Sequence, residues 1–99
     1  MSKQILPNEE TLDAMEKMLN VASDYTRLKI LFALMDGEKC VSEIQDIADA
    51  SQSLVSHQLR VLRDSKLVDY RKDGTKVCYF LTDDHVRKIL SIVLDHVTE

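Results

Sequence analysis

Two short amphipathic segments joined by a tight turn, within residues 41–64, constrain the fold of this chain more than any other feature. The first segment, 41–48, has apolar residues at helical spacing, which predicts a short helix. Asp49-Ala50 predicts a turn, and Ser51 is a favourable N-cap for a second helix over 52–64. The residues expected to face inward in the first helix are Val41, Ile44, Ile47 and Ala48. Two short helices joined in this way are typical of a helix-turn-helix.

The helix predicted over 52–64 has two chemically different faces. Its apolar face, expected to dock on the rest of the protein, consists of Val55, Leu59 and Leu62, flanked by Leu54 and Val61. The opposite face carries side chains that can hydrogen-bond to base edges in a DNA major groove. The predicted DNA-contacting residues of this helix are Gln52, Ser53, Ser56, His57 and Arg60. This pattern favours a reading helix over a merely solvated surface helix.

Residues 67–81 are predicted to form a β-hairpin. Leu67 to Arg71 and Lys76 to Leu81 are rich in residues that favour strands, and Asp73-Gly74 between them is a strong hairpin turn signal. Lys72 and Lys76 flank the tip, where basic residues can reach a backbone phosphate or the minor groove. Because a hairpin directly after a helix-turn-helix is a wing, the predicted fold class is mainly α with a small β-hairpin, a winged helix-turn-helix.

The charge of the chain is unevenly distributed. The net charge is −4, which by itself argues against a nucleic-acid partner. Between residues 52 and 76, however, six Lys and Arg outnumber three Asp, so this segment carries +3 and the remainder −7. A basic segment on an acidic body is the charge pattern expected of a DNA-binding face.

The remaining segments indicate a single domain over 1–99. Residues 1–8 are expected to fray, with a first helix starting at Pro7 or Asn8, and Asp24 is the predicted N-cap of a second helix that ends at Asp36-Gly37. The apolar stripe of the first helix is Leu12, Met15, Leu19 and Ala22, with Met18 alongside. No apolar run approaches the length of a membrane span and the start carries no signal-peptide pattern, so we expect a cytoplasmic protein with no membrane partner.

Residues 83–99 are predicted to form an amphipathic helix, with Asp83 or Thr82 as its N-cap. Its apolar stripe is Val86, Ile89, Leu90, Val93 and Val97. Its possible metal ligands are Asp83, His85, His96 and Glu99. His85 and His96 are eleven residues apart, about 16 Å along a helix, so one ion cannot bind both within one chain. The ordinary alternative is that these side chains are solvated surface residues.

A second copy of the chain would solve this geometric problem. In an antiparallel pair of these helices, Asp83 and His85 of one chain meet His96 and Glu99 of the other, twice per dimer. The resulting set of two imidazoles and two carboxylates is suited to tetrahedral Zn(II). We therefore expect a homodimer in which 83–99 serves both dimerisation and metal binding; the predicted fold class adds the first helix to the dimer interface.

The order of these elements resembles the arsenic-repressor (ArsR/SmtB) family of bacterial winged-helix metal sensors, over roughly residues 12–99. The likeness lies in the run Asp24-Tyr25-Thr26-Arg27-Leu28, in the run Ser51-Gln52-Ser53-Leu54-Val55-Ser56-His57-Gln58-Leu59 and in the spacing of the four possible ligands. That spacing is similar to the zinc-sensing branch of the family. The resemblance implies that the last helices of two subunits supply the ligands, and that a homodimeric repressor releases its inverted-repeat operator when Zn(II) binds.

The same resemblance argues against a second kind of metal site. In the family this site is built from a Glu-Leu-Cys-Val-Cys-Asp run, whereas residues 38–43 read Glu-Lys-Cys-Val-Ser-Glu here. Because Ser42 stands in place of the second Cys, a thiolate site for arsenite, cadmium or lead is not expected.

The same fold could respond to effectors other than Zn(II). Cys40 and Cys78 would allow a thiol redox or persulfide sensor if their sulfurs lie within disulfide reach or one thiol is reactive; otherwise they are packed thiols. Ni(II) or Co(II) are alternative effectors, although the third histidine, His57, belongs to the reading helix. An enzyme is not expected, because four protein ligands would close the zinc shell and no nucleophile triad or Gly-rich phosphate loop is present.

Overall fold

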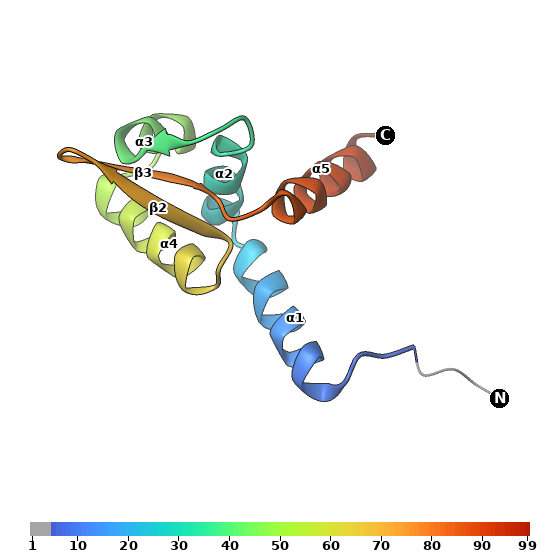
Figure 1. Cartoon of the computed structure of the whole chain (residues 1–99). Helices are drawn as coiled ribbons and strands as arrows, with labels where there is room; N and C mark the ends of the chain where they lie inside the picture. The colour runs from blue at the N-terminus through green and yellow to red at the C-terminus, as the bar shows by residue number, and fades with distance from the viewer. Residues whose placement is uncertain (1–4) are drawn as a thin grey trace.

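The computed structural model describes residues 5–99. Fraying was predicted for residues 1–8; residues 1–4 lie outside the described chain, and residues 5–8 belong to no helix or strand. The elements follow in the order α1 (Glu9–Ala22), α2 (Tyr25–Ala33), β1 (Lys39–Cys40), α3 (Val41–Ala48), α4 (Gln52–Asp64), β2 (Val68–Asp73), β3 (Lys76–Leu81) and α5 (Asp84–Thr98) (Figure 1). Among residues 5–99, no helix combines the length and the apolar character that crossing a membrane requires.

Side-chain caps explain where most of the helices begin. The N-caps of α1, α2, α4 and α5 are Asn8, Asp24, Ser51 and Asp83, and each accepts a backbone N–H of its own first turn. The start of each of these helices was predicted from the sequence and is confirmed. α2 ends at Ala33, earlier than the predicted stop at Asp36-Gly37, because the N–H of Leu34 bonds to the carbonyl of Leu31 in a tighter last turn.

A tight turn joins the two helices of the helix-turn-helix. Asp49 ends α3 with φ of 52°, a left-handed conformation that reverses the chain between α3 and the Ser51 cap of α4. The bounds of α3 and α4 are those predicted from the sequence. The local pattern of residues 41–64 therefore specified this unit correctly.

The hairpin was predicted, but the sheet has a third strand that was not. The strands pair in the order β1-β3-β2, and both pairings are antiparallel. In the turn between β2 and β3, Gly74 has φ of 66°, which glycine adopts without strain. β2 occupies Val68–Asp73 rather than the predicted 67–71. β1 is only two residues long, so it has no alternating pattern by which it could have been predicted.

One hydrophobic core holds the helix-turn-helix, the sheet and the start of α5 together. Its buried members are Ile30, Leu31, Leu34, Ile44, Ala48, Val55, Leu59, Leu62, Leu67, Val68, Leu81, Val86 and Leu90. The prediction that Ile47 faces inward is wrong, since this side chain is 52% exposed. Ile44 and Ala48, one turn apart on α3, take the buried face, and Ile47 lies at the edge of that face.

α1 and α5 leave the body on the side opposite the tip of the hairpin (Figure 1). The radius of gyration is 15.3 Å, against about 13 Å for a compact chain of 100 residues. No residue of α1 is buried, and the apolar side chains of Leu19 and Val97 are 61% and 71% exposed. In a single chain the apolar stripe predicted for the first helix is therefore largely uncovered, and that of the last helix is covered only at Val86 and Leu90.

Candidate DNA interface and metal site

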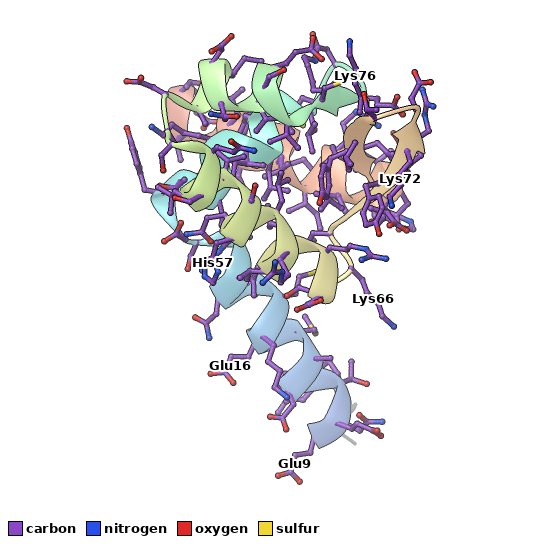
Figure 2. All side chains as sticks on the ribbon, turned by 90° about the vertical axis from the view of Figure 1, so that its left-hand side faces the viewer. Glu9, Glu16, His57, Lys66, Lys72 and Lys76 are labelled. Atoms are coloured by element: carbon purple, nitrogen blue, oxygen red, sulfur yellow. The ribbon has the colours of Figure 1, made fainter. Side chains whose placement is uncertain are left out.

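The predicted DNA-contacting residues of α4 all lie on its exposed face. Val55, Leu59 and Leu62 are completely buried, which fixes how α4 is turned on the core. The residues that this orientation leaves in solvent include Gln52, Ser53, Ser56, His57 and Arg60. His57 can be located on α4 in Figure 2. The structure thus places the five side chains on one face, and their contact with DNA stays a prediction.

The basic residues of the wing lie on the side of the molecule that also carries α4. Lys72 and Lys76 are exposed on the hairpin (Figure 2). Within residues 5–99, Lys72, Lys76 and Arg60 form no ion pair with an acidic side chain. These three cations are therefore free to neutralise phosphates.

Two other basic residues of this segment are occupied within the chain. Arg71 Nη2 lies 2.6 Å from Glu38 Oε2, and this carboxylate raises the pKa of the Arg71 guanidinium. Arg63 lies over the ring of Tyr70, 4.3 Å from its centroid, and its Nε lies 3.4 Å from Asp69 Oδ1. The positive charge counted from the sequence is thus partly balanced internally.

A hollow of about 410 Å³ lies between the start of α4 and β3 of the wing. Gln52 and Ser56 line it from α4, Lys76 and Tyr79 line it from β3, and Cys40 lines it from β1. The candidate reading helix and a candidate wing contact therefore share one concave surface.

The four predicted ligands form two pairs at the two ends of α5. Asp83 Oδ1 accepts the backbone N–H groups of His85 (2.9 Å) and Val86 (3.4 Å), and it lies 3.4 Å from His85 Nδ1. His96 lies in the exposed last turn, and Glu99 is the C-cap. The structure brings Asp83 and His85 together and leaves His96 and Glu99 at the far end of the helix.

The donor chemistry of these residues fits a zinc site. Imidazole and carboxylate are both ordinary zinc ligands, and the side chains of Asp83 and His85 are 56% and 86% exposed, so an ion from solvent can reach both. In the described part of one chain, however, no three His, Cys, Asp or Glu side chains are grouped so that they could hold a metal ion. A site with all four donors therefore needs a second chain, and its existence stays a prediction.

Two arginines connect separate helices: Arg27 joins α1 and α2 to α4, and Arg87 joins α5 to the segment after α2. Sequence reasoning singled out neither as functional. Arg27 Nε donates to the carbonyl of Val21 and its Nη1 donates to Gln58 Oε1, both at 2.7 Å. Arg87 Nε donates to the carbonyl of Met35 at 2.8 Å. Their partners lie in other elements, so no local sequence signal could have named them.

Cys40 and Cys78 face each other across β1 and β3. They are direct partners in the strand register, with free thiols whose Sγ atoms are 2.6 Å apart. Cys78 is buried and Cys40 is half-buried. The hydrogen bond with Cys40, together with burial, raises the pKa of Cys78 to about 11. The condition set for a thiol-based input, two sulfurs within disulfide reach, is therefore met.

A helix-turn-helix of α3 and α4, followed by the β2–β3 wing, defines a winged helix-turn-helix domain. The chain belongs to the ArsR family of bacterial regulatory proteins. The profile described as "Bacterial regulatory protein, arsR family" matches residues 24–70. The chain is 38% identical over 100 residues to a transcriptional repressor SmtB homologue from Synechocystis, across 98% of this chain and 76% of that protein.

A further relative and a solved structure agree with this assignment. The cadmium resistance transcriptional regulatory protein CadC homologue of Staphylococcus aureus is 34% identical over 99 residues, across 99% of this chain and 81% of the relative. The homodimeric winged helix-turn-helix DNA-binding domain of a possible ArsR-family regulator from Mycobacterium bovis superposes with a TM-score of 0.87 at 25% identity, across 100% and 92% of the two chains. The relatives are transcriptional regulators rather than enzymes, which confirms the expectation that this chain is not an enzyme.

Proposed function

We propose that this chain is a homodimeric transcriptional repressor that binds an inverted-repeat operator and releases it when Zn(II) binds between the two α5 helices. One observation carries the proposal: Asp83 and His85 converge at the start of α5, and the remaining donors, His96 and Glu99, lie at its end. Each end supplies half of a tetrahedral shell. The names of the relatives, an SmtB repressor and a cadmium-resistance regulator, support a metal ion as the effector.

The dimer is proposed to form through α1 and α5. The exposed apolar residues of these helices are Leu12, Met15, Met18, Leu19, Ile89, Ile92, Val93, Leu94 and Val97. Exposed apolar surface on neighbouring helices is typical of a protein–protein interface. An apolar groove of about 240 Å³ between α1 and α5 is lined by Leu19 and Ile89 and also by Asp83 and His85, so the proposed interface and half of the ligand set adjoin.

The effector is proposed to be Zn(II), with Ni(II) or Co(II) as alternatives. When bound, the ion would supply a positive crosslink between carboxylate and imidazole donors of two subunits. Ni(II) and Co(II) sites commonly recruit more than four ligands, and the remaining histidine, His57, is on α4. A thiol input is the second candidate function, and the juxtaposition of Cys40 and Cys78 favours it.

Displacement of α5 would reach both DNA-contacting elements. β3 ends at Leu81, two residues before Asp83, so the wing and the ligand pair are almost continuous in the chain. Arg87 joins α5 to the end of α2, and Arg27 joins α2 to Gln58 on α4. The arrangement that does not fit the operator must hold the ion more tightly, or no release follows. By reciprocity, bound operator weakens metal binding by the same factor.

The proposal is tested with a fluorescent duplex selected from random-sequence DNA by the metal-free protein. We expect Zn(II) to weaken binding of the wild type by about tenfold or more and to leave His96→Ala unaffected. Asp95→Ala is the matched control, because its exposed carboxylate neighbours His96 but is outside the ligand set. Fluorescence anisotropy at fixed ionic strength measures all three proteins.

Each outcome of this experiment has a clear meaning. If Zn(II) does not change duplex binding by the wild type, the zinc proposal is rejected. If only Ni(II) or Co(II) releases the duplex, that ion is the effector instead of Zn(II). A zinc response that survives in His96→Ala rejects the ligand assignment. If no duplex is enriched in the selection, the DNA-binding proposal itself fails.

A further inference from the structure

Cys40 and Cys78 are placed so that a bond between them needs no backbone movement. They are direct cross-strand partners with Sγ atoms 2.6 Å apart. Opposed residues of antiparallel strands have Cα atoms about 4.5–5.5 Å apart, which lies within the range of about 4.4–6.8 Å found in disulfides. Oxidation therefore requires only an adjustment of the two side chains.

The two thiols differ in their access to solvent. Cys40 lines the hollow between α4 and the wing, whereas Cys78 is buried and does not line it. Gln52, Ser56 and Lys76, all of them candidate DNA contacts, line the same hollow. A duplex seated on α4 and the wing would therefore cover Cys40.

We propose that Cys40 and Cys78 form a reversible oxidation site on the DNA-facing surface, with Cys40 as the entry thiol and Cys78 as the resolving thiol, and that bound DNA and an adduct on Cys40 exclude each other. The oxidants are peroxides and small-molecule disulfides. The exclusion of DNA rests on the proposed function, whereas the chemistry of the pair does not. Neither depends on the metal ligands of α5.

The chemistry balances for both classes of oxidant. With hydrogen peroxide, Cys40 sulfur attacks one oxygen: an S–O bond forms, the O–O bond breaks and water leaves with the thiol proton. Cys78 sulfur then attacks Cys40 sulfenic acid: the S–S bond forms, the S–O bond breaks and a second water leaves. With oxidised glutathione, attack by Cys40 releases one glutathione and attack by Cys78 releases the other. In each case the thiol pair loses two electrons, and a reducing thiol reverses the reaction.

The surroundings of Cys78 set the order of attack. The hydrogen bond with Cys40, burial and the negative charges of Cys40 and Glu38 raise its pKa to about 11, and the nearby Arg71 acts in the opposite direction. At neutral pH little of Cys78 is thiolate, which is the attacking form. Modification of Cys40 removes the largest of these causes and presents an electrophilic sulfur beside Cys78.

A first experiment tests the pair without DNA or metal. Hydrogen peroxide should remove two hydrogens from the intact mass of the full chain, and peptide mapping should join Cys40 to Cys78 within one subunit. In Cys78→Ser, oxidation should stop at a sulfenic acid on Cys40, which dimedone traps.

A labelling rate compares the accessibility of the two thiols. Cys40→Ser, which keeps only the Cys78 thiol, should react with N-ethylmaleimide about tenfold more slowly than Cys78→Ser. Alanine versions repeat the comparison if thermal unfolding shows that a serine variant does not fold. Absence of this disulfide, or a bond between subunits, overturns the assignment.

A second experiment tests the exclusion of DNA. In Cys78→Ser, saturating amounts of the selected duplex should slow the labelling of Cys40 by N-ethylmaleimide by about tenfold or more. Glutathione bound to Cys40 of the same variant should weaken duplex binding by about tenfold, that is by about 1.4 kcal/mol. Wild type treated with oxidised glutathione should carry the disulfide and no glutathione. Equal labelling with and without bound duplex overturns the exclusion, and retained glutathione overturns the resolving role. If no duplex binds, the exclusion falls with the proposed function, and the mass measurement alone decides the pair.

Discussion

At the scale of single residues, Arg27 makes the contact that most directly joins an outer helix to α4. Its guanidinium donates to the carbonyl of Val21 at the end of α1 and to Gln58 on α4. Its backbone N–H is held by Asp24, the N-cap of α2. Hydrogen bonds from a charged donor contribute about 1.5–3 kcal/mol each. One side chain thus fixes the position of three helices relative to one another.

Loss of this contact should lower the stability of the protein. Arg27→Met keeps the apolar stem, removes two of these bonds and should lower the free energy of unfolding by about 3 kcal/mol. Gln58→Ala removes one of them and should lower it by about 1.5 kcal/mol. A double-mutant cycle by urea unfolding at fixed protein concentration should give a coupling above about 0.5 kcal/mol. Lys17→Met, which removes an exposed cation from α1, is the control and should change stability by less than about 0.5 kcal/mol. Strict additivity of the two losses would contradict the assignment.

At the scale of elements, α4 and the wing have different parts in the proposed DNA contact. α4 presents side chains suited to base edges, whereas the hairpin presents Lys72 and Lys76, whose charge suits phosphate. A residue of the first kind should alter which sequence is bound. A residue of the second kind should alter binding to every sequence about equally.

Lys76→Gln should weaken binding of the selected duplex and reduce its salt dependence. Because a homodimer carries two copies of Lys76, the slope of log K against log salt should fall in magnitude by about 2. Titrations at several salt concentrations, with a scrambled duplex in parallel, measure this slope. Lys17→Gln is the matched control, since it removes an exposed lysine from α1 rather than from the wing. An unchanged slope would show that Lys76 does not contact phosphate.

Local patterns predicted the elements that are themselves local. The bounds of α4 follow from the Ser51 cap and from apolar residues one turn apart, both of which are visible in a few consecutive residues. β1 and the facing of Cys40 and Cys78 depend on a pairing with β3 that joins residues 38 positions apart. Ile47 has the periodicity of a core residue but lies at the edge of the buried face of α3. Tertiary placement, rather than residue type, decided each of these cases.

At the scale of the whole molecule, the division of the ligand set makes the proposed metal site a property of the pair. Asp83 and His85 lie at one end of α5 and His96 and Glu99 at the other, and no single chain groups three such side chains over residues 5–99. An antiparallel pair would hold two equivalent sites, each taking half of its ligands from either subunit.

A heterodimer of two ligand variants should therefore regain the zinc binding that each variant homodimer has lost. His85→Ala and His96→Ala homodimers are both expected to lack a complete site. In the heterodimer one site lacks both histidines and the other keeps all four donors, so purification on two different affinity tags should yield a species that binds one Zn(II) per dimer. Chelator competition measures the stoichiometry. A heterodimer that binds no better than its parents would show that each site is built within one chain.

In the proposed dimer, the apolar residues that a single chain leaves uncovered on α1 and α5 would link the lifetime of the protein to its abundance. A chain whose helices are protected only by a partner has a stability that depends on concentration, and a separated subunit offers the unprotected α1 to proteases. When synthesis slows, we expect the copy number to fall first by dilution and then faster, as separated subunits are degraded. Loss of repression should then be steeper than growth of the cell alone would cause.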